Sequence, residues 1–256
     1  MADLPSPLSG FYLVNKPVGP SSAAVSNRLK WLLIQSGSPK KGPGALRIGH
    51  GGTLDPLADG LLPIGLGKCT KQLQGLLEGP KTYTFTLTFG TQTTTDDAEG
   101  DPVATSAVRP TEAAILAVLP RFTGPILQTP PSFSALKIGG QRAYTLARAG
   151  EEVTLQPRPV TIHNLKLLNS TRDTQNATLT SAFLEAEVSK GTYIRSLARD
   201  LAEALGTLGH TTTLTRTRHG PFSLNQAVSF ETLDKALQAG DMHTYLLPPL
   251  DVPPAE

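Results

Sequence analysis

The sequence is poor in cysteine, in aromatic residues and in long apolar runs, and these shortages exclude several classes of protein. A single cysteine, Cys69, among 256 residues excludes a disulfide framework and a cysteine-based zinc site. No stretch approaches the roughly 20 apolar residues that a membrane-spanning helix needs. The N-terminus has no basic start followed by an apolar run, so we expect no signal peptide. A cytoplasmic protein without membrane contact is the expectation.

A strong excess of one charge is also missing, because 23 Lys and Arg residues nearly balance 21 Asp and Glu residues. A formal net charge of +2 does not by itself indicate a nucleic-acid-binding protein. Basic residues do gather in four groups, and each group taken alone is typical of solvent-exposed surface. The groups are Lys40, Lys41 and Arg47; Lys68, Lys71 and Lys81; Arg142 and Arg148; and Arg216, Arg218 and His219.

Hydrophobic residues make up 39% of the chain, enough for a packed core. Alternation of apolar and polar residues predicts strands, most clearly over 82–89. Helical periodicity predicts one helix after a cap at Ser21 or Ser22, and another from a Thr192 cap to Gly206. Further strands are expected over 11–15, 159–168, 178–188 and 211–218, and further helices over 69–77, 111–119 and 231–239. This irregular mixture predicts an α+β fold, with a mixed or antiparallel central sheet flanked by helices.

The most informative motif is a glycine-dense loop with one carboxylate at its centre, GHGGTLDPLADGLLPIGLG. Glycine permits positive φ or close approach of another group, and Pro56 restricts the backbone directly after Asp55. An apolar run follows. Asp55 is therefore held beside an open space, and we take it as the candidate reactive group.

Other readings of this region are weaker. GLGKCT fails as a phosphate loop because Cys69 replaces the required Ser or Thr, and a dinucleotide fingerprint fails at Leu54. His50, Asp55 and Asp59 form a possible metal site, which the flexible glycines disfavour. No nucleophile elbow supports a Ser-His-Asp triad.

Two further residues invite a functional reading, although simpler explanations stay open. Tyr83 shares the apolar face of its predicted strand, so core packing alone would explain it. Arg195 lies beside the apolar stripe of its predicted helix, near the N-terminal end where cations are disfavoured. It should therefore have an anionic partner. An ordinary surface ion pair, worth roughly 0–1 kcal/mol, is an equally good reading.

Five segments taken together are more specific than any one motif. NKPVGPSS, RIGHGGTLDPLADGLLPIGLGKCTK, KTYTFTLTFG, PPSFSALKIGGQRAYTLARAG and SKGTYIRSLARDLAEALG occur in this order. In this respect the chain resembles the TruB family of tRNA pseudouridine synthases along nearly its whole length. The resemblance implies a pseudouridine synthase fold and an isomerase that converts the T-loop uridine of tRNA, at tRNA position 55, to pseudouridine. It implies neither a metal nor an organic cofactor.

The resemblance also implies roles for individual residues. Asp55 matches the catalytic aspartate, Tyr83 the active-site tyrosine and Arg195 the arginine of GTYIR. A bidentate guanidinium would keep the carboxylate ionised and oriented inside a pocket that excludes water. The residues expected to bind substrate are His50, which would enter the T-loop, Lys16, which would buttress the catalytic loop, Leu214, which would wall the pocket, and Tyr193, Lys68 and Arg142.

The expected organisation is a catalytic domain over 9–247, with an RNA-gripping insertion at about 130–153 and a frayed tail over 248–256. The C-terminal RNA-binding domain common in the bacterial type would then be absent or reduced. The expected partner is the T-arm of tRNA, bound by a monomer without an obligatory protein partner. Two alternatives stay open: a non-catalytic RNA-binding or RNA-folding module, and the related RNA-guided synthase subunit.

Overall fold

The computed structural model describes residues 8–42, 44–134, 136–138, 141–143, 145, 155–174 and 178–250. Two compact units make up the chain: Met1–Gly79 with Thr215–Glu256, and Pro80–Leu214. The boundary falls inside strand β12 (Gly209–His219), which therefore contributes one part to each unit. In the described part of the chain, no helix is long and apolar enough to cross a membrane.

The first unit contains a mixed sheet. Its elements are β1 (Gly10–Lys16), α1 (Ser22–Gln35), β2 (Ile48–His50), β3 (Asp59–Leu66), a 3₁₀ turn (Gly67–Thr70), α2 (Leu73–Glu78), β13 (Phe222–Ser223), a second 3₁₀ turn (Leu224–Gln226), β14 (Val228–Ser229) and α6 (Phe230–Gln238). Strand β1 runs antiparallel to β3 and parallel to β14, while the end of β12 runs parallel to β3. β2 pairs antiparallel with β3, and β13 pairs antiparallel with β12.

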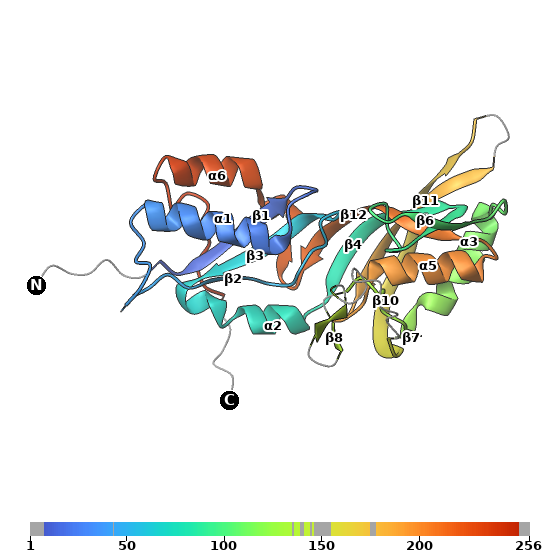
Figure 1. Cartoon of the computed structure of the whole chain (residues 1–256), viewed down its shortest axis with the longest axis horizontal. Helices are drawn as coiled ribbons and strands as arrows, with labels where there is room; N and C mark the ends of the chain where they lie inside the picture. Colours follow the sequence, from blue (N-terminus) through green and yellow to red (C-terminus); the bar gives the residue numbers. More distant parts are fainter. Residues whose placement is uncertain are drawn as a thin grey trace, which may run out of the picture. The chain divides into compact units, whose positions relative to one another are not determined.

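Local sequence explains these elements. Ser21 caps α1, because its side chain accepts a hydrogen bond from the amide of Ala24 at 3.1 Å. The apolar residues at helical spacing in α1 are buried: Val25, Leu29, Leu32 and Leu33. Helices α1 and α6 lie side by side (Figure 1), where Arg28 makes a bidentate ion pair with Asp234 at 2.7 and 3.0 Å. The core of the sheet is a cluster of Phe11, Leu13, Leu61, Cys69, Leu73, Leu76 and Phe222.

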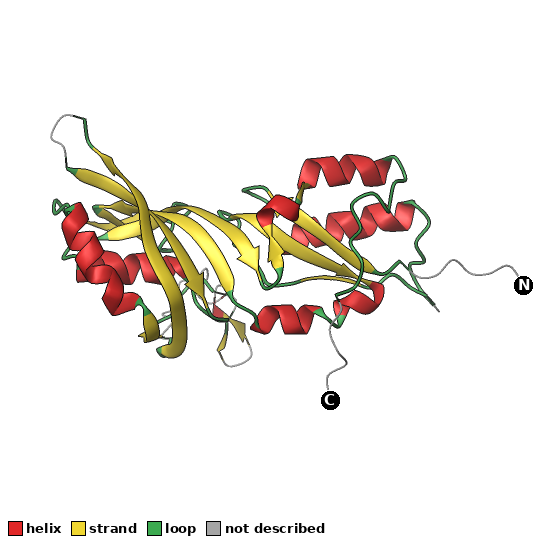
Figure 2. Ribbon diagram, turned by 180° about the vertical axis from the view of Figure 1, so that it is seen from behind, coloured by secondary structure: helices red, strands yellow, loops and turns green. Residues whose placement is uncertain are grey.

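In the second unit, hydrogen-bonded strands follow one another across the sheet in the order β12-β4-β11-β10-β7. Its elements are β4 (Lys81–Phe89), β5 (Thr91–Thr93), β6 (Pro102–Thr105), α3 (Glu112–Val118), a 3₁₀ turn (Leu119–Phe122), β7 (Gly124–Gln128), β8 (Lys137–Ile138), β9 (Gln141–Arg142), β10 (Arg158–Arg172), β11 (Leu179–Val188) and α5 (Ile194–Ala204). The three pairs from β4 to β7 are antiparallel. Helices α3 and α5 lie on one side of these strands, as the two opposite views of Figures 1 and 2 show.

The predicted α+β class with a mixed sheet and flanking helices is confirmed, and two local predictions are wrong, those of a helix cap and of three exposed basic side chains. The N-cap position of the helix after GTY is Tyr193, which makes no side-chain cap bond, and not Thr192, whose hydroxyl donates to the Ser189 carbonyl. Leu250 is held in place, because its amide donates to the Gln72 side chain and its carbonyl accepts from that side chain, while residues 251–256 of the predicted tail lie outside the described residues. Three basic side chains expected at the surface are buried: Lys81, Arg216 and His219. The domain limits 9–247 and 130–153 stay predictions.

Candidate active site

Asp55 lies half-buried in the loop that joins β2 to β3, and hydrogen bonds hold its neighbours. Ser22, fully buried at the start of α1, accepts from the Leu54 amide at 2.8 Å and donates to the Leu54 carbonyl at 3.1 Å. The Ala58 amide donates to the Asp55 carbonyl at 3.1 Å. The backbone on both sides of the carboxylate is therefore fixed, which a reacting group requires.

Lys16 supports the same loop from the end of β1. Its side chain is fully buried, and its Nζ donates to the carbonyls of Pro17 and Pro20 at 2.8 and 2.9 Å. These bonds close the turn after β1. The Gly19 amide of that turn donates to the carbonyl of Pro56, directly after the candidate carboxylate, at 2.8 Å. These contacts support the buttressing role predicted for Lys16.

Arg216 bridges the two ends of the loop. It is 1% exposed, its Nε donates to the Leu61 carbonyl at 2.8 Å, and its Nη2 donates to the Gly52 carbonyl at 3.1 Å. The close packing explains one glycine of the motif. Gly60 has φ +96°, and a Cβ there would lie 2.5 Å from the carbonyl oxygen of Arg216, so only glycine fits.

His50 is half-buried at the end of β2. Burial lowers its pKa, and the positive charge of Arg216 lowers it further. The imidazole is therefore neutral at pH 7. Its Nδ1 is buried without a hydrogen-bond partner. A neutral ring of this kind is suited to contact with a nucleobase, because base recognition in RNA loops relies on stacking.

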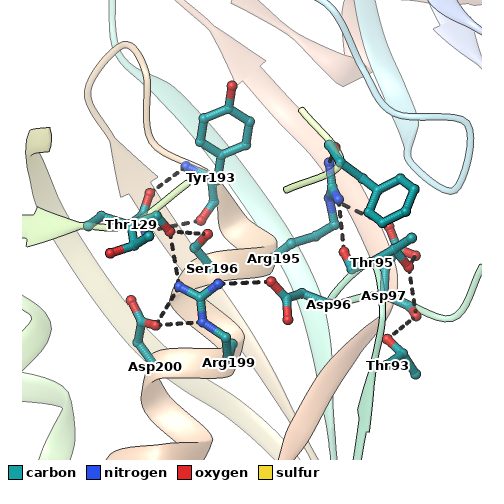
Figure 3. A network of polar contacts seen from close by, with 12 residues as sticks. Thr93, Thr95, Asp96, Asp97, Thr129, Tyr193, Arg195, Ser196, Arg199 and Asp200 are labelled. Carbon is teal, nitrogen blue, oxygen red and sulfur yellow. Dashed lines mark hydrogen bonds and ion pairs between the residues drawn. The ribbon is translucent and has the colours of Figure 1, made fainter. Parts of the chain in front are cut away.

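Arg195 is buried near the start of α5, 4% exposed, and it lies among polar groups of the second unit (Figure 3). Its Nε is 3.5 Å from Oδ2 of Asp97, which is itself 3% exposed. Its Nη1 donates to the Thr95 carbonyl at 2.8 Å and its Nη2 to the Phe133 carbonyl at 3.0 Å. The expectation of an anionic partner for Arg195 is met by Asp97, and the pair is buried rather than on the surface.

The start of α5 depends on the side chain of Gln128 at the end of β7. Its Oε1 accepts from the Tyr193 amide at 2.8 Å, and its Nε2 donates to the Tyr193 carbonyl at 3.1 Å. Gln128 is 1% exposed. It therefore satisfies the amide of the N-cap residue Tyr193 and fixes the backbone directly before Arg195.

The other predicted residues lie in varied surroundings. Tyr83 is only half-buried, whereas Phe85 and Leu87 on the same strand are 0% and 1% exposed. Core packing thus accounts for Tyr83 less well than for its neighbours. Leu214 is buried on β12, and Lys68 is exposed in the turn after β3. Arg142 belongs to β9, its side chain lying outside the described part, and Arg148 lies outside the described residues.

The predicted residues fall into two sets. Asp55, His50, Lys16 and Lys68 belong to the first unit, and Tyr83, Arg195, Tyr193, Leu214 and Arg142 to the second. Pairing of Asp55 with Arg195 stays a prediction, because these residues belong to different units. The residues that sequence reasoning missed are Ser22 as a support of the loop, Arg216, Asp96, Asp97 and Arg199. Among the described residues, no three His, Cys, Asp or Glu side chains gather as metal ligands would.

Family comparisons agree with the motifs. Residues 40–194 match the model of the TruB family pseudouridylate synthase N-terminal domain, and residues 195–252 that of the tRNA pseudouridylate synthase B C-terminal domain. A curated tRNA pseudouridine synthase B of Gluconobacter oxydans is 44% identical over 95% of this chain and 69% of its own length. That of Novosphingobium aromaticivorans is 47% identical over 94% of this chain and 77% of its own length.

Solved structures show the same fold. A Cbf5-Nop10-Gar1 complex contains a chain with a TM-score of 0.66 and 28% identity, over 92% of this chain and 57% of that one. An H/ACA RNP bound to a substrate RNA containing 2'-deoxyuridine contains another, with a TM-score of 0.65 and 25% identity, over 93% of this chain. This chain thus spans 57% and 59% of the length of those two chains.

Proposed function

Because the chain belongs to the TruB family of pseudouridylate synthases, we propose that it isomerises the T-loop uridine of tRNA, at tRNA position 55, to pseudouridine. One observation supports this most directly. The backbone around Asp55 is held by Ser22, by the turn that Lys16 closes, and by Arg216, although the carboxylate itself is only half-buried. Such a fixed and accessible acid is what the reaction needs.

The isomerisation breaks the bond between N1 of uracil and the ribose, turns the base, and joins C5 to the same carbon. Asp55 serves as the nucleophile, or as the base that takes a proton from the sugar. Either role requires the ionised form. Burial disfavours an ionised carboxylate, and a guanidinium at close range favours it. Arg195 supplies that guanidinium in the proposed site, and Asp97 and the two carbonyls fix its orientation.

Two other side chains act on the uracil. Tyr83 stacks on the ring, and its hydroxyl assists the transfer of the C5 proton. The half-buried position of Tyr83 on β4 supports this role, because a stacking residue must present one face of its ring. Leu214 walls the pocket, so the detached base stays close to the sugar.

The target base is stacked in the folded T-loop and must be extruded, which costs a few kcal/mol. His50 occupies the space that the base leaves. The lowered pKa of His50 supports this, since a neutral imidazole replaces a stacked base without introducing a charge. Lys68 and Arg142 contact the RNA backbone, and Tyr193 contacts the bound nucleotide.

The test is activity on a bare T-arm stem-loop. We expect the purified chain, without other proteins or guide RNA, to release tritium from a stem-loop labelled at C5 of the T-loop uridine. A matched stem-loop with cytidine at that position should release none. Tight binding without turnover would favour a non-catalytic RNA-binding module. Activity that depends on guide RNA and partner proteins would favour an RNA-guided subunit.

The exposed Lys40 and Lys41 should act on affinity rather than on chemistry. Replacing both by glutamine should lower the slope of log affinity against log salt by about 1.4, because two phosphate contacts are lost. The single-turnover rate at saturating RNA should not change. The matched control replaces Lys30 and Lys235, two exposed lysines on helices α1 and α6. Equal slopes for the two double variants would contradict the prediction.

A further inference from the structure

Helix α5 carries a second arginine, half-buried, one turn after the first. Arg195 and Arg199 are four residues apart, so they lie on the same face of the helix (Figure 3). Arg199 Nη1 donates to Oδ2 of Asp96 at 2.9 Å, and Nη2 donates to the Thr129 carbonyl at 3.0 Å. Arg195 donates to the carbonyls of Thr95 and Phe133. Both arginines therefore contact the same two segments, one around residues 95–97 and the other around residues 129–133.

Asp96 occupies an unusual backbone position. It is the one residue other than glycine with positive φ in the described part of the chain, at 58°. Such a conformation is uncommon for aspartate and persists only where the surroundings hold it. Its carbonyl accepts from the Thr211 amide at 3.0 Å, and its side chain is held by Arg199. Thr95 and Asp97, the residues on either side, both contact Arg195, which also donates to Phe133.

From these contacts we infer that Arg199 and Asp96 form a positioning pair, which sets the orientation of Arg195 by fixing the turn that holds it. The inference rests on the proposed function, in which Arg195 faces the catalytic carboxylate. Neither member of the pair touches the substrate in this scheme. Both act through Thr95 and Asp97, whose carbonyl and carboxylate determine where the Arg195 guanidinium points.

A second carboxylate provides a matched control. Asp200 Oδ1 accepts from Nε and Nη2 of Arg199 at 2.9 and 2.8 Å, but Asp200 belongs to α5 and not to the turn. Loss of the Asp200 carboxylate therefore removes a negative charge beside the Arg199 guanidinium but leaves the bond between Arg199 and Asp96 in place. Two carboxylates share one guanidinium, and burial raises the pKa of Asp96 while Arg199 and Arg195 oppose the rise. Arg199 and Asp96 also line a cavity of about 270 Å³, so solvent reaches the pair.

The experiment compares wild type with Arg199→Gln, Asp96→Asn, their double variant and Asp200→Asn, on the T-arm stem-loop. Each of the first two should lower the single-turnover rate by about tenfold or more, because small misplacements of catalytic groups cost this much. RNA affinity should change by less than about twofold, since positioning and not binding is altered. The double variant should match the single ones, because the two residues act as one link. Asp200→Asn should keep the wild-type rate.

The pH profile adds a readout that loss of stability would not move. Asp96 faces Arg195, Arg199 and Asp200 of α5 and Asp97 of its own turn. In the wild type, protonation of Asp96 breaks its ion pair with Arg199, so the acidic limb of the rate should contain a contribution from Asp96. That contribution should be missing from both Arg199→Gln and Asp96→Asn, because the pair is already broken in each. If Arg199→Gln does not fold, the single-turnover rate of Asp96→Asn alone tests the inference. A wild-type rate in a folded variant, or an equal loss in Asp200→Asn, overturns the inference. An inactive wild type would instead overturn the proposed function.

Discussion

Replacing Asp55 with asparagine should reduce pseudouridine formation by roughly 10⁴-fold or more, the upper range for loss of a catalytic acid or base. Asparagine has nearly the same shape, but it can neither attack as an anion nor accept a proton. The loop should keep its conformation, because the hydrogen bonds at the backbone of Leu54, Asp55 and Pro56 are retained in the variant. Affinity for the stem-loop should therefore stay within about threefold of wild type.

The measurement is tritium release under single-turnover conditions, with RNA affinity determined separately by filter binding. Asp59→Asn is the matched control, since Asp59 lies four residues further on, at the start of β3. Full activity of Asp59→Asn, and an unchanged wild-type rate in the presence of a chelator, would argue against a metal held by His50, Asp55 and Asp59. Turnover by Asp55→Asn at the wild-type rate would remove the basis of the proposed mechanism.

Much of the site could be predicted from sequence because its signals are local. Glycine, proline and a single carboxylate within one short motif define the Asp55 loop without knowledge of the fold. Likewise, the position of Arg195 near a helix start predicted a partner. The identity of that partner within the second unit, Asp97, was not predictable, because it lies in the segment TQTTTDDAEGDP, which has the composition of any polar loop.

The buried cations show a second limit of sequence reasoning. Arg216 and Arg218 both follow Leu214 at alternate positions of the segment TLTRTR, so the pattern gives no sign of which arginine is buried. The burial of Arg216 depends on residues that are distant in sequence. Leu61 and Gly52 accept hydrogen bonds through their carbonyls, and Gly60 leaves room for the Arg216 backbone. Ser22 shows the same limit. The local sequence indicated a possible helix cap, whereas its hydroxyl hydrogen-bonds the backbone of Leu54, which is distant in sequence.

Replacing Arg195 with methionine should produce two separable defects. The first is a loss of about 3–5 kcal/mol of folding free energy, the cost of removing one partner of a buried ion pair. Asp97 would then remain buried beside a methyl group, at 3% exposure. The second is a loss of activity of about 10² to 10³ fold, the effect expected from removing one group that stabilises charge in an active site.

The double variant Arg195→Met/Asp97→Asn separates the two. An asparagine can still accept from the Glu99 amide and from Thr95, as Asp97 Oδ1 does, and it leaves no buried charge. Denaturant unfolding should therefore show most of the lost stability restored. Tritium release should stay as low as in the single variant, because the guanidinium proposed to act on Asp55 is still missing. If activity returned together with stability, Arg195 would be a structural residue only, and another group would have to orient the Asp55 carboxylate.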